Sequence, residues 1–554
     1  MKLSSLTKTS LLLFVCFGID KLAAILRQLI IARQFGLSTE LDVFNIANNL
    51  PDMLFILISG GAMSMVLIPV MTEVMTRDGR AAGWRLFSSI ANLAFLCSLV
   101  LAVIIALLAE PIVSSEIGIA PGFTAEQRSL VVNLMRLNLI ATMIFSISGL
   151  VMGGLQANRH FLLPALAPIL YNAGQIFGAL VLSPETPYVF GPFTLPHFGM
   201  GIYGLVTGVI IGALLHLAIQ IPGLIRLKFR WAPVIALQDA AVRNVLRIMG
   251  PRVLSVFFVQ LIFIVRDNLA SRLATGAVTA LSYGYMFQQL PETLIGTVIG
   301  TAILPSLSTF AAEQDQKAYE ETIQKSCRLS VAFSLGSAVI IGIGLGPLVQ
   351  FAFGMSAAES GFLMWTLRGF LVGLAGHCLL EVVNRAFYAQ QEALIPLLGT
   401  AINLLLYIGI GALLFRRLDA PGISLTDSIA FTIQAVFLLW CLRQPLQRRV
   451  NWLRSAGKNR FIRWLAIGGS SMDGDRGIDG EGRPLGQLSA QVRVGGTFWR
   501  TLAGAVLSGL LCLGVMTSNF IQADILVKSI IGMILAGLFY AVFILPEIKI
   551  LKKF

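Results

Sequence analysis

The sequence has few charged residues for its length. Only 12% of its 554 residues are Asp, Glu, Lys or Arg, whereas soluble domains carry about 25%. This scarcity excludes an ordinary soluble protein. The chain is instead 56% hydrophobic, and apolar runs of about 20 residues, each long enough to cross a bilayer as a helix, recur along almost all of it. We therefore predict an all-α, multi-pass membrane protein.

Residues that bind metals or form disulfides are also scarce. The six cysteines are scattered and form no C-x-x-C motif, so we predict isolated buried thiols and no disulfide framework. The four histidines show no metal-ligand spacing, and no glycine-rich lysine motif for ATP is present. The sequence therefore predicts no metal, no cofactor and no enzyme activity.

Basic residues are concentrated in alternate loops. The net charge of +13 could indicate nucleic-acid binding, but we expect no nucleic-acid partner because aromatic and basic residues do not interleave. Basic residues occur at 77–85, 226–230, 317–328 and the C-terminal KILKKF, whereas EPIVSSEIGIAPGF carries none. Lysine and arginine are enriched in cytoplasmic loops, so we predict cytoplasmic termini, with Arg128, Arg272, Arg416 and Arg417 as exceptions. The N-terminus resembles a signal peptide, but its helical pattern continues to Gly36, so we expect a first span there.

Hydropathy and loop composition predict about fourteen membrane-spanning helices. They lie near residues 9–36, 40–72, 83–112, 126–157, 161–183, 199–224, 240–271, 276–311, 319–353, 357–390, 393–415, 422–442, 497–517 and 522–549. The stretch between the twelfth and thirteenth predicted spans begins RQPLQRRVNWLRSAGKNRFIRW, a basic sequence with aromatic residues that is suited to lie on an anionic membrane surface. It continues into the loop-like SSMDGDRGIDGEGRPLG. The alternative is that this stretch only connects two spans.

An internal repeat organises these spans. NNLPDMLFILISGGAMSMVLIPVMTE near residue 50 resembles QQLPETLIGTVIGTAILPSLSTFAAE near residue 290, and QANRHFLLPALAPILYN resembles YAQQEALIPLLGTAIN. The two matches come in the same order, which favours duplication over chance. We predict two pseudo-symmetric six-helix lobes, at 1–230 and 231–442, a linker at 443–496 and two further helices at 497–554. Transporters built from such repeats bind substrate between the copies.

Ionisable residues lie inside the predicted spans. Asp20, Arg27 and Gln34 are seven residues apart and share one face of the first span, with Lys21 beside them. Each mid-bilayer charge costs about 2.5–3.5 kcal/mol on insertion scales, so this face should line a wet cavity. The alternative is that Asp20 merely neutralises Lys21 or Arg27.

Further charges lie in the second and seventh predicted spans. The repeat relates the first span to the seventh and the second to the eighth. The second span contributes Asp42 and Asp52, and the seventh contributes Arg252, Arg266 and an adjacent Asp267. We expect the first, second, seventh and eighth spans to line a polar cavity. The candidate substrate-binding residues are Lys21, Arg27, Asp42, Asp52, Arg252 and Arg266.

The second span also contains helix-breaking residues. Pro51 removes a backbone donor, and Gly60 and Gly61 loosen the helix in its middle. A helix that lines a cavity tolerates such a break, because water and neighbours satisfy the freed groups. We therefore predict a hinge or gate at these three residues. Close helix packing through small residues is the alternative, and both can hold together.

At these residues the sequence resembles the MurJ/MviN lipid II flippases of the MOP transporter superfamily. The shared features are RQLIIARQFG at 27–36, Asp42-Val43-Phe44, Leu50-Pro51, Gly61-Ala62, Asn158-Arg159, Gly250-Pro251 and LPSLS at 304–308. The resemblance implies a two-lobed fold of fourteen helices. It implies alternating access that carries an undecaprenyl-diphosphate-linked peptidoglycan precursor across the bacterial inner membrane. Cavity cations would meet the diphosphate, the last two helices would form a groove for the polyprenyl tail, and other cell-wall synthesis proteins are possible partners.

The chain departs from this family at several cavity positions. An early family arginine falls on Lys21 and the next on Arg27, but two others fall on Phe55 and Met286. We expect Arg252 and Arg266 to supply the missing charge at successive stages, since they are about 21 Å apart along a helix. The alternative is that Asp267 holds Arg266 in a structural pair.

Other functions remain open at this point. The cargo could be another polyprenyl-linked oligosaccharide. A cation-coupled multidrug antiporter is a further alternative, although that type usually has twelve helices. A scaffold or receptor would not need cavity charges in both lobes.

Overall fold

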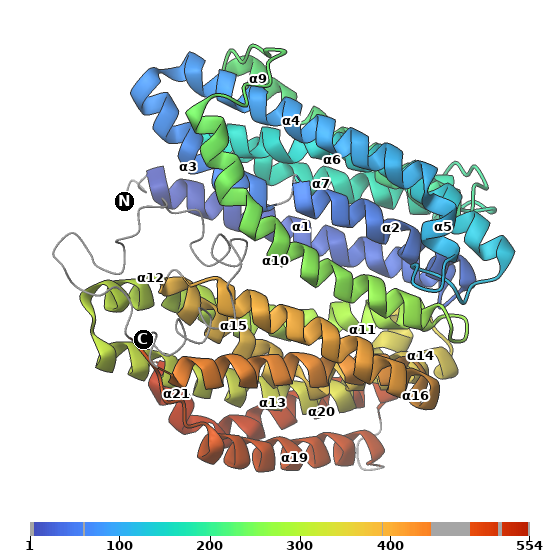
Figure 1. Ribbon diagram of the computed structural model, residues 1–554. Helices are drawn as coiled ribbons and strands as arrows, with labels where there is room; N and C mark the ends of the chain where they lie inside the picture. The colour runs from blue at the N-terminus through green and yellow to red at the C-terminus, as the bar shows by residue number, and fades with distance from the viewer. Residues whose placement is uncertain (1–4, 59–60, 391, 445–487, 519–522, 552–554) are drawn as a thin grey trace. The chain divides into compact units, whose positions relative to one another are not determined.

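The computed structural model describes residues 5–58, 61–390, 392–444, 488–518 and 523–551. Helices dominate these residues (Figure 1). The chain forms two compact units, Met1–Val278 and Thr279–Phe554.

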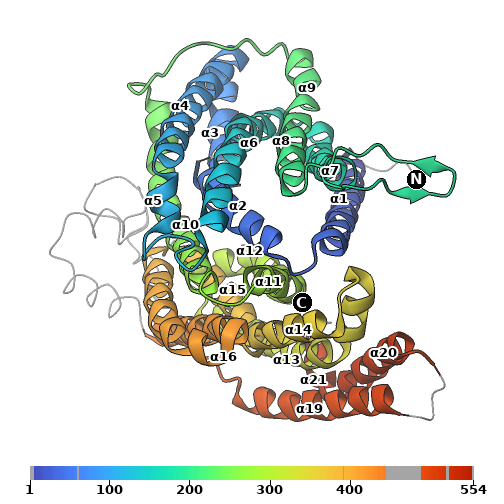
Figure 2. The same ribbon diagram turned by 90° about the vertical axis from the view of Figure 1, so that its right-hand side faces the viewer.

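The first unit consists of long helices and one small hairpin. Its elements are α1 (Ser5–Phe35), α2 (Thr39–Ile58), α3 (Gly61–Asp78), α4 (Arg80–Leu107), α5 (Ala109–Ser114), α6 (Ala125–Ala157), α7 (Leu162–Phe177), the π-helix η1 (Gly178–Leu182), β1 (Val189–Phe190), β2 (Phe193–Thr194), α8 (Ile202–Ala218), α9 (Ile221–Arg226) and α10 (Ala240–Ala270). The strands pair antiparallel, Val189 with Thr194, and the hairpin projects away from the helices (Figure 2). Side chains cap the starts of two of these helices: Thr124 and Gln127 form a capping box on α6, and Asp239 accepts from Ala241 N–H on α10.

The second unit is entirely helical in its described part. Its elements are α11 (Ala277–Glu292), which begins at the end of the first unit, η2 (Thr293–Thr297), α12 (Val298–Glu313), α13 (Gln316–Phe353), α14 (Ala357–Val372), α15 (Leu374–Ala389), α16 (Leu394–Arg443), α19 (Gly495–Thr517), α20 (Ile525–Phe543) and α21 (Leu545–Leu551). Helix α16 contains two predicted spans. It is interrupted at Asp419, where φ is 58°, a value that residues other than glycine rarely adopt.

Length and hydropathy identify the spans. Ten helices in the described part of the chain could each cross a membrane, or eleven if the bent pair α14 and α15 forms one span. Each of the fourteen predicted spans overlaps a helix, two of them within α16, but α1 and α10 do not meet the length and hydropathy criteria, so the number fourteen stays a prediction. Exposed apolar side chains such as Leu99, Val103 and Leu107 on α4 are suited to lipid contact. The prediction of an all-α, multi-pass membrane protein is confirmed.

Both spans that carry the repeated Leu-Pro pair contain a proline inside a helix. The predicted span 40–72 contains α2 and α3, and residues 59–60 between them lie outside the described residues. The predicted span 276–311 is α11, then the π-helix η2, then α12. Pro51 lies inside α2 and Pro291 inside α11. Proline lacks the N–H that the helix ladder needs, so the repeated prolines weaken both spans at corresponding points.

Helices α7 and α8 approach each other closely through glycines. A Cβ atom at Gly174 would lie 2.4 Å from the backbone of Gly212, and one at Gly208 would lie 2.8 Å from Gly178 Cα. Small residues allow this approach, which is common between membrane helices. The contact fixes α7, which carries part of the site described below.

The compact units and the sequence repeat divide the chain differently. The units separate after residue 278, because α10 packs on α2, α3 and α4 in the first unit. Compactness and sequence similarity are different properties, so the lobe boundaries at 1–230 and 231–442 stay a prediction. Of the predicted linker 443–496, residues 445–487 lie outside the described part.

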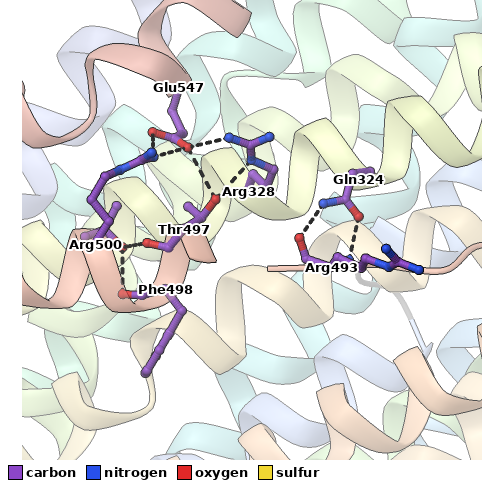
Figure 3. Close-up of polar contacts among 8 residues, drawn as sticks. Gln324, Arg328, Arg493, Thr497, Phe498, Arg500 and Glu547 are labelled. Carbon is purple, nitrogen blue, oxygen red and sulfur yellow. Dashed lines mark hydrogen bonds and ion pairs between the residues drawn. The ribbon is translucent and has the colours of Figure 1, made fainter. Parts of the chain in front are cut away.

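An extended segment, Leu488–Arg493, lies along α13 and precedes α19. Gln316 pairs with both backbone groups of Ser489, and Glu320 accepts from Gln491 N–H at 3.0 Å. Gln324 pairs with both backbone groups of Arg493 (Figure 3). These α13 side chains replace the ladder partners that an extended strand would find in a sheet.

A buried carboxylate joins the C-terminal helices of the second unit. The Glu547 side chain on α21 is fully buried and accepts hydrogen bonds from Arg328 on α13, at 3.0 Å, and from Arg500 on α19 (Figure 3). Thr497 Oγ1 lies 3.4 Å from the same carboxylate. A buried charge needs such partners, so this network ties α21 and α19 to α13.

Candidate functional site

A polar cluster joins α1 and α7 in the first unit. Arg27 Nη1 donates to Asn172 Oδ1 at 3.0 Å, and Asn172 Nδ2 donates to Asp20 Oδ1 at 2.9 Å. Asn172 is 4% exposed and also donates to Pro168 O at 3.2 Å. The seven-residue spacing predicted that Asp20 and Arg27 share a face. A neutral amide from another helix, which both charges contact, lies between them.

Arg27 keeps donors that this bridge does not use. Its guanidinium has five N–H groups, and one of them donates to Asn172. Its Nε is buried and makes no hydrogen bond within the described residues. Asn172 therefore holds the Arg27 guanidinium in place while other N–H groups stay available as donors. An anion-binding arginine needs such available N–H groups.

Asp52 on α2 extends the cluster. Asp52 is exposed, and its carboxylate interacts electrostatically with Arg27. Both charges also interact electrostatically with the Tyr171 side chain of α7. We call Asp20, Arg27, Asp52, Tyr171 and Asn172 the first-unit cluster. Lys21 follows Asp20 on α1 and is exposed beside this cluster. Three of the predicted residues, Lys21, Arg27 and Asp52, are thus in one region.

Aromatic rings border the first-unit cluster where the resemblance implies another arginine. Phe55 on α2 has its ring centroid 5.3 Å from that of Phe145 on α6, and Phe145 lies 5.0 Å from the Tyr171 ring. His216 also packs on Phe145, at 5.4 Å. The position therefore contributes an aromatic wall in place of a cation.

Asp42 lies elsewhere and has a structural partner. It is 3% exposed and accepts from Gly276 N–H through Oδ2 at 2.6 Å. Gly276 has φ +88°, which suits glycine, and a Cβ there would come within 2.9 Å of Leu37 O. Asp42 thereby fixes the loop between α10 and α11. Its geometry favours anchoring of this loop over contact with a substrate.

The two predicted cations of α10 differ in what surrounds them. Arg266 is 8% exposed, pairs through Nε with Asp267 Oδ1 at 3.1 Å and lies 4.9 Å from the centre of the Phe263 ring. This is the structural pair that the sequence left as an alternative. Arg252 belongs to α10, but its side chain lies outside the described part.

The predicted gate residues lie in α2 and at the start of α3. Pro51 is buried in α2, and its carbonyl accepts from Thr142 Oγ1 of α6 at 3.2 Å. Gly61 begins α3, and Gly60 lies outside the described residues. A hinge or gate at these residues stays a prediction.

Sequence reasoning missed Asn172 and Tyr171. Both end the repeated stretch QANRHFLLPALAPILYN, which was read only for its prolines. A polar residue at the end of a repeated motif inside a membrane span was an available signal. Their closeness to Arg27 was not, because about 145 residues separate them in the chain.

Comparisons with known proteins agree on one family. The family model "Lipid II flippase MurJ" matches residues 31–464. "Lipid II flippase MurJ" of Burkholderia cenocepacia is 27% identical over 448 residues, which cover 79% of this chain and 84% of the relative. "Probable lipid II flippase MurJ" of Buchnera aphidicola is 25% identical over 437 residues, which cover 78% and 82%.

Solved structures show the same fold. "Lipid II flippase MurJ, inward closed conformation" has a TM-score of 0.72 at 18% identity and covers 97% of this chain and 100% of that one. An inward-facing multidrug resistance MATE family transporter of the MOP superfamily has a TM-score of 0.61 at 15% identity, covering 80% and 99%. The family model spans well over half of the sequence. The chain therefore belongs to the lipid II flippase MurJ family, whose members are membrane transporters and not enzymes.

Proposed function

We propose that this protein moves lipid II, an undecaprenyl-diphosphate-linked peptidoglycan precursor, across the cytoplasmic membrane by alternating access. The observation that carries the proposal is Arg27, a partly unsatisfied guanidinium held by Asn172 on α1, the first predicted span of a MurJ-family chain. A cation inside a membrane marks a substrate path more often than a structural contact. The diphosphate is the anionic part of the cargo that such a cation would bind.

Arg27 and Lys21 have different parts in this proposal. They are six residues apart on α1, or about 9 Å along its axis, so they meet different ends of an extended head group. Arginine can grip phosphate with two parallel N–H groups, whereas lysine acts as a point charge. Arg252 is retained as a cytoplasmic-side contact, and Asp42 and Arg266 are left out because each has a buried structural partner.

Replacement of Arg27 tests the proposal. Arg27→Ala should abolish lipid II translocation in vesicles and fail to support growth of cells depleted of their own flippase, while expression and thermal unfolding stay normal. Arg33→Ala is the matched control, because Arg33 is on the same helix but exposed near its end. Normal translocation by Arg27→Ala would show that the head-group assignment is wrong.

The cargo class needs its own comparison. Purified protein should bind lipid II more tightly than an undecaprenyl-diphosphate carrying an unrelated oligosaccharide, because the sugar and peptide add contacts to the shared diphosphate. Equal binding would favour a broader polyprenyl-oligosaccharide flippase. Export of cationic drugs without lipid binding would instead favour an antiporter.

We also propose an orientation and a tail site. Loop charges favour cytoplasmic termini in a bacterial inner membrane, which reporter fusions at each end would check. Helices α19 and α20 pack on α13 and expose apolar side chains such as Leu510 and Leu538, a surface suited to a polyprenyl chain. Cell-wall synthesis proteins are candidate partners, and cross-linking in cells would identify them.

A further inference from the structure

A buried histidine lies between two carboxylates in the second unit. His377 on α15 is 3% exposed, and its Nε2 is 2.9 Å from Asp427 Oδ2 on α16. Its Nδ1 is 3.7 Å from Glu292 Oε1 on α11. The imidazole stacks on Phe431 with ring centroids 4.2 Å apart. Three helices thus contribute to a site that the first-unit cluster does not include.

The neighbouring polar groups define the charge of this site. Gln288 on α11 donates to Glu292 Oε2 at 3.0 Å. On α15, one turn beyond His377, Glu381 pairs with Arg385 at 3.1 Å and so adds no net charge. Asp427 is the charged residue that α16 contributes. Glu292 and Asp427 therefore face His377 with two negative charges.

A proton on the imidazole satisfies this arrangement. A neutral histidine has one N–H, which can donate to Asp427, whereas an imidazolium also carries the positive charge that Glu292 stabilises from ion-pair distance. A buried carboxylate without a compensating charge costs several kcal/mol. The geometry therefore favours a proton on each ring nitrogen, and the proton partly compensates the two carboxylates.

The other buried histidine of the described spans provides a contrast. His216 on α8 is 7% exposed, and its Nδ1 lies 2.6 Å from Ser148 Oγ and 3.3 Å from Gln220 Nε2. These partners are neutral and need no imidazolium. Burial in a membrane helix is common to both histidines, so the carboxylates are what distinguish His377.

Glu292 is placed where it can move. It is the last residue of α11, directly after Pro291 and directly before the π-helical segment η2. Short π-helical segments in helices often mark functional sites. The distance of 3.7 Å to His377 exceeds that of a hydrogen bond. A small shift of this helix break would make or remove the Glu292 contact while Asp427 keeps its own.

We propose that His377, Glu292 and Asp427 form a proton-binding site that couples proton movement to transport. When Glu292 approaches, the imidazole takes a proton from water on one side of the membrane and forms a second N–H bond. When Glu292 withdraws, that bond breaks and the proton is released to water on the opposite side, so one proton crosses the membrane in each cycle and the protein ends the cycle unchanged. The coupling rests on the transport function proposed above, whereas the proton site itself does not.

Transport under an imposed pH gradient tests the coupling. Proteoliposomes with the membrane potential clamped should accumulate cargo in a ratio that changes by up to about tenfold per pH unit for each coupled proton, since 1.4 kcal/mol corresponds to tenfold. His377→Gln and Glu292→Gln should lose this response, and the matched control His216→Gln should keep it. A wild-type ratio independent of the gradient, or a response retained in folded His377→Gln, would overturn the proposal.

A direct measurement separates this proposal from the cargo assignment. The chain has only four histidines, so ¹⁵N-histidine NMR of the full-length protein, assigned with the two histidine variants, can report each charge state. His377 should be an imidazolium at neutral pH and His216 neutral. A neutral His377 overturns the proton site even if lipid II is transported. A charged His377 in a protein that moves no lipid II refutes the cargo assignment alone.

Discussion

At the scale of single residues, Asn172 has the largest expected effect for a neutral side chain. It accepts from Arg27, donates to Asp20 and is almost fully buried. Asn172→Ala would leave both charges without their common partner, at a cost of about 1–3 kcal/mol for unsatisfied buried groups. We expect lower thermal stability together with weaker cargo binding, measured by thermal unfolding and by lipid II titration of the purified protein.

A substitution at Asn92 would distinguish a loss of stability from a loss of cargo binding. Asn92 also uses its amide to hold another segment, donating to the carbonyls of Ala232 and Val234 at 2.8 and 3.0 Å, but it lies outside the first-unit cluster. Asn92→Ala should lower stability and leave cargo affinity unchanged. If both variants weaken binding equally, Asn172 has no specific role in positioning Arg27.

Spacing along one helix could be predicted from the sequence, and contacts between helices could not. The seven-residue interval correctly put Asp20 and Arg27 on one face of α1, since that depends only on helix geometry. The bridging Asn172 and the Asp42 contact with Gly276 join segments that are 145 and 234 residues apart. Such contacts depend on packing, for which one sequence has no local signal.

At the scale of helices, Glu547 determines how the last segments attach. Glu547→Ala would leave Arg328 and Arg500 without their shared carboxylate. Both arginines are partly exposed, so we expect a loss of about 1–3 kcal/mol, below that of a fully buried pair. Thermal unfolding should show it, and protease cleavage should become faster near α21.

Glu321 provides the comparison on α13. It pairs with Lys325 at 3.3 Å, and both side chains are about half exposed. An exposed pair contributes about 0–1 kcal/mol, so Glu321→Ala should hardly change unfolding. Equal effects of the two substitutions would mean that burial of Glu547 adds nothing to the attachment of α21.

Helix positions were easier to predict than helix continuity. Every helix in the described part of the chain that is long and apolar enough to span a membrane overlaps a predicted span, because a run of about 20 residues is a direct requirement of the bilayer. Proline and glycine residues suggested a bend in the span over 40–72, and its described parts are α2 and α3, with residues 59–60 outside the described part. The π-helix η2 and the kink at Asp419 depend on neighbouring helices, which satisfy backbone groups that the ladder does not.

At the scale of the whole molecule, we predict that alternating access depends on bending at Gly60 and Gly61, between α2 and α3. Replacing Gly60 and Gly61 together with leucine should hold the transporter in one orientation, because leucine favours a continuous helix. In a variant without the native cysteines, new cysteines at cavity positions should become reachable by membrane-impermeant reagents from one side only. Labelling from both sides, as in the parent protein, would leave the glycines a packing role alone.

The pairing between α13 and the extended segment Leu488–Arg493 also restricts the length of that segment. Gln316, Glu320 and Gln324 are four residues apart, or about 6 Å along the helix, and every second residue of an extended chain advances about 6.6 Å. The two spacings differ by about 0.6 Å from one contact to the next. Three successive contacts tolerate this difference, but it would accumulate over a longer segment. The chain before residue 488 can therefore change length in evolution without disturbing α19. A single-residue insertion between Ser489 and Arg493 would turn one of these three backbone contacts away from α13. Relatives should therefore vary in length before residue 488 and not between residues 489 and 493.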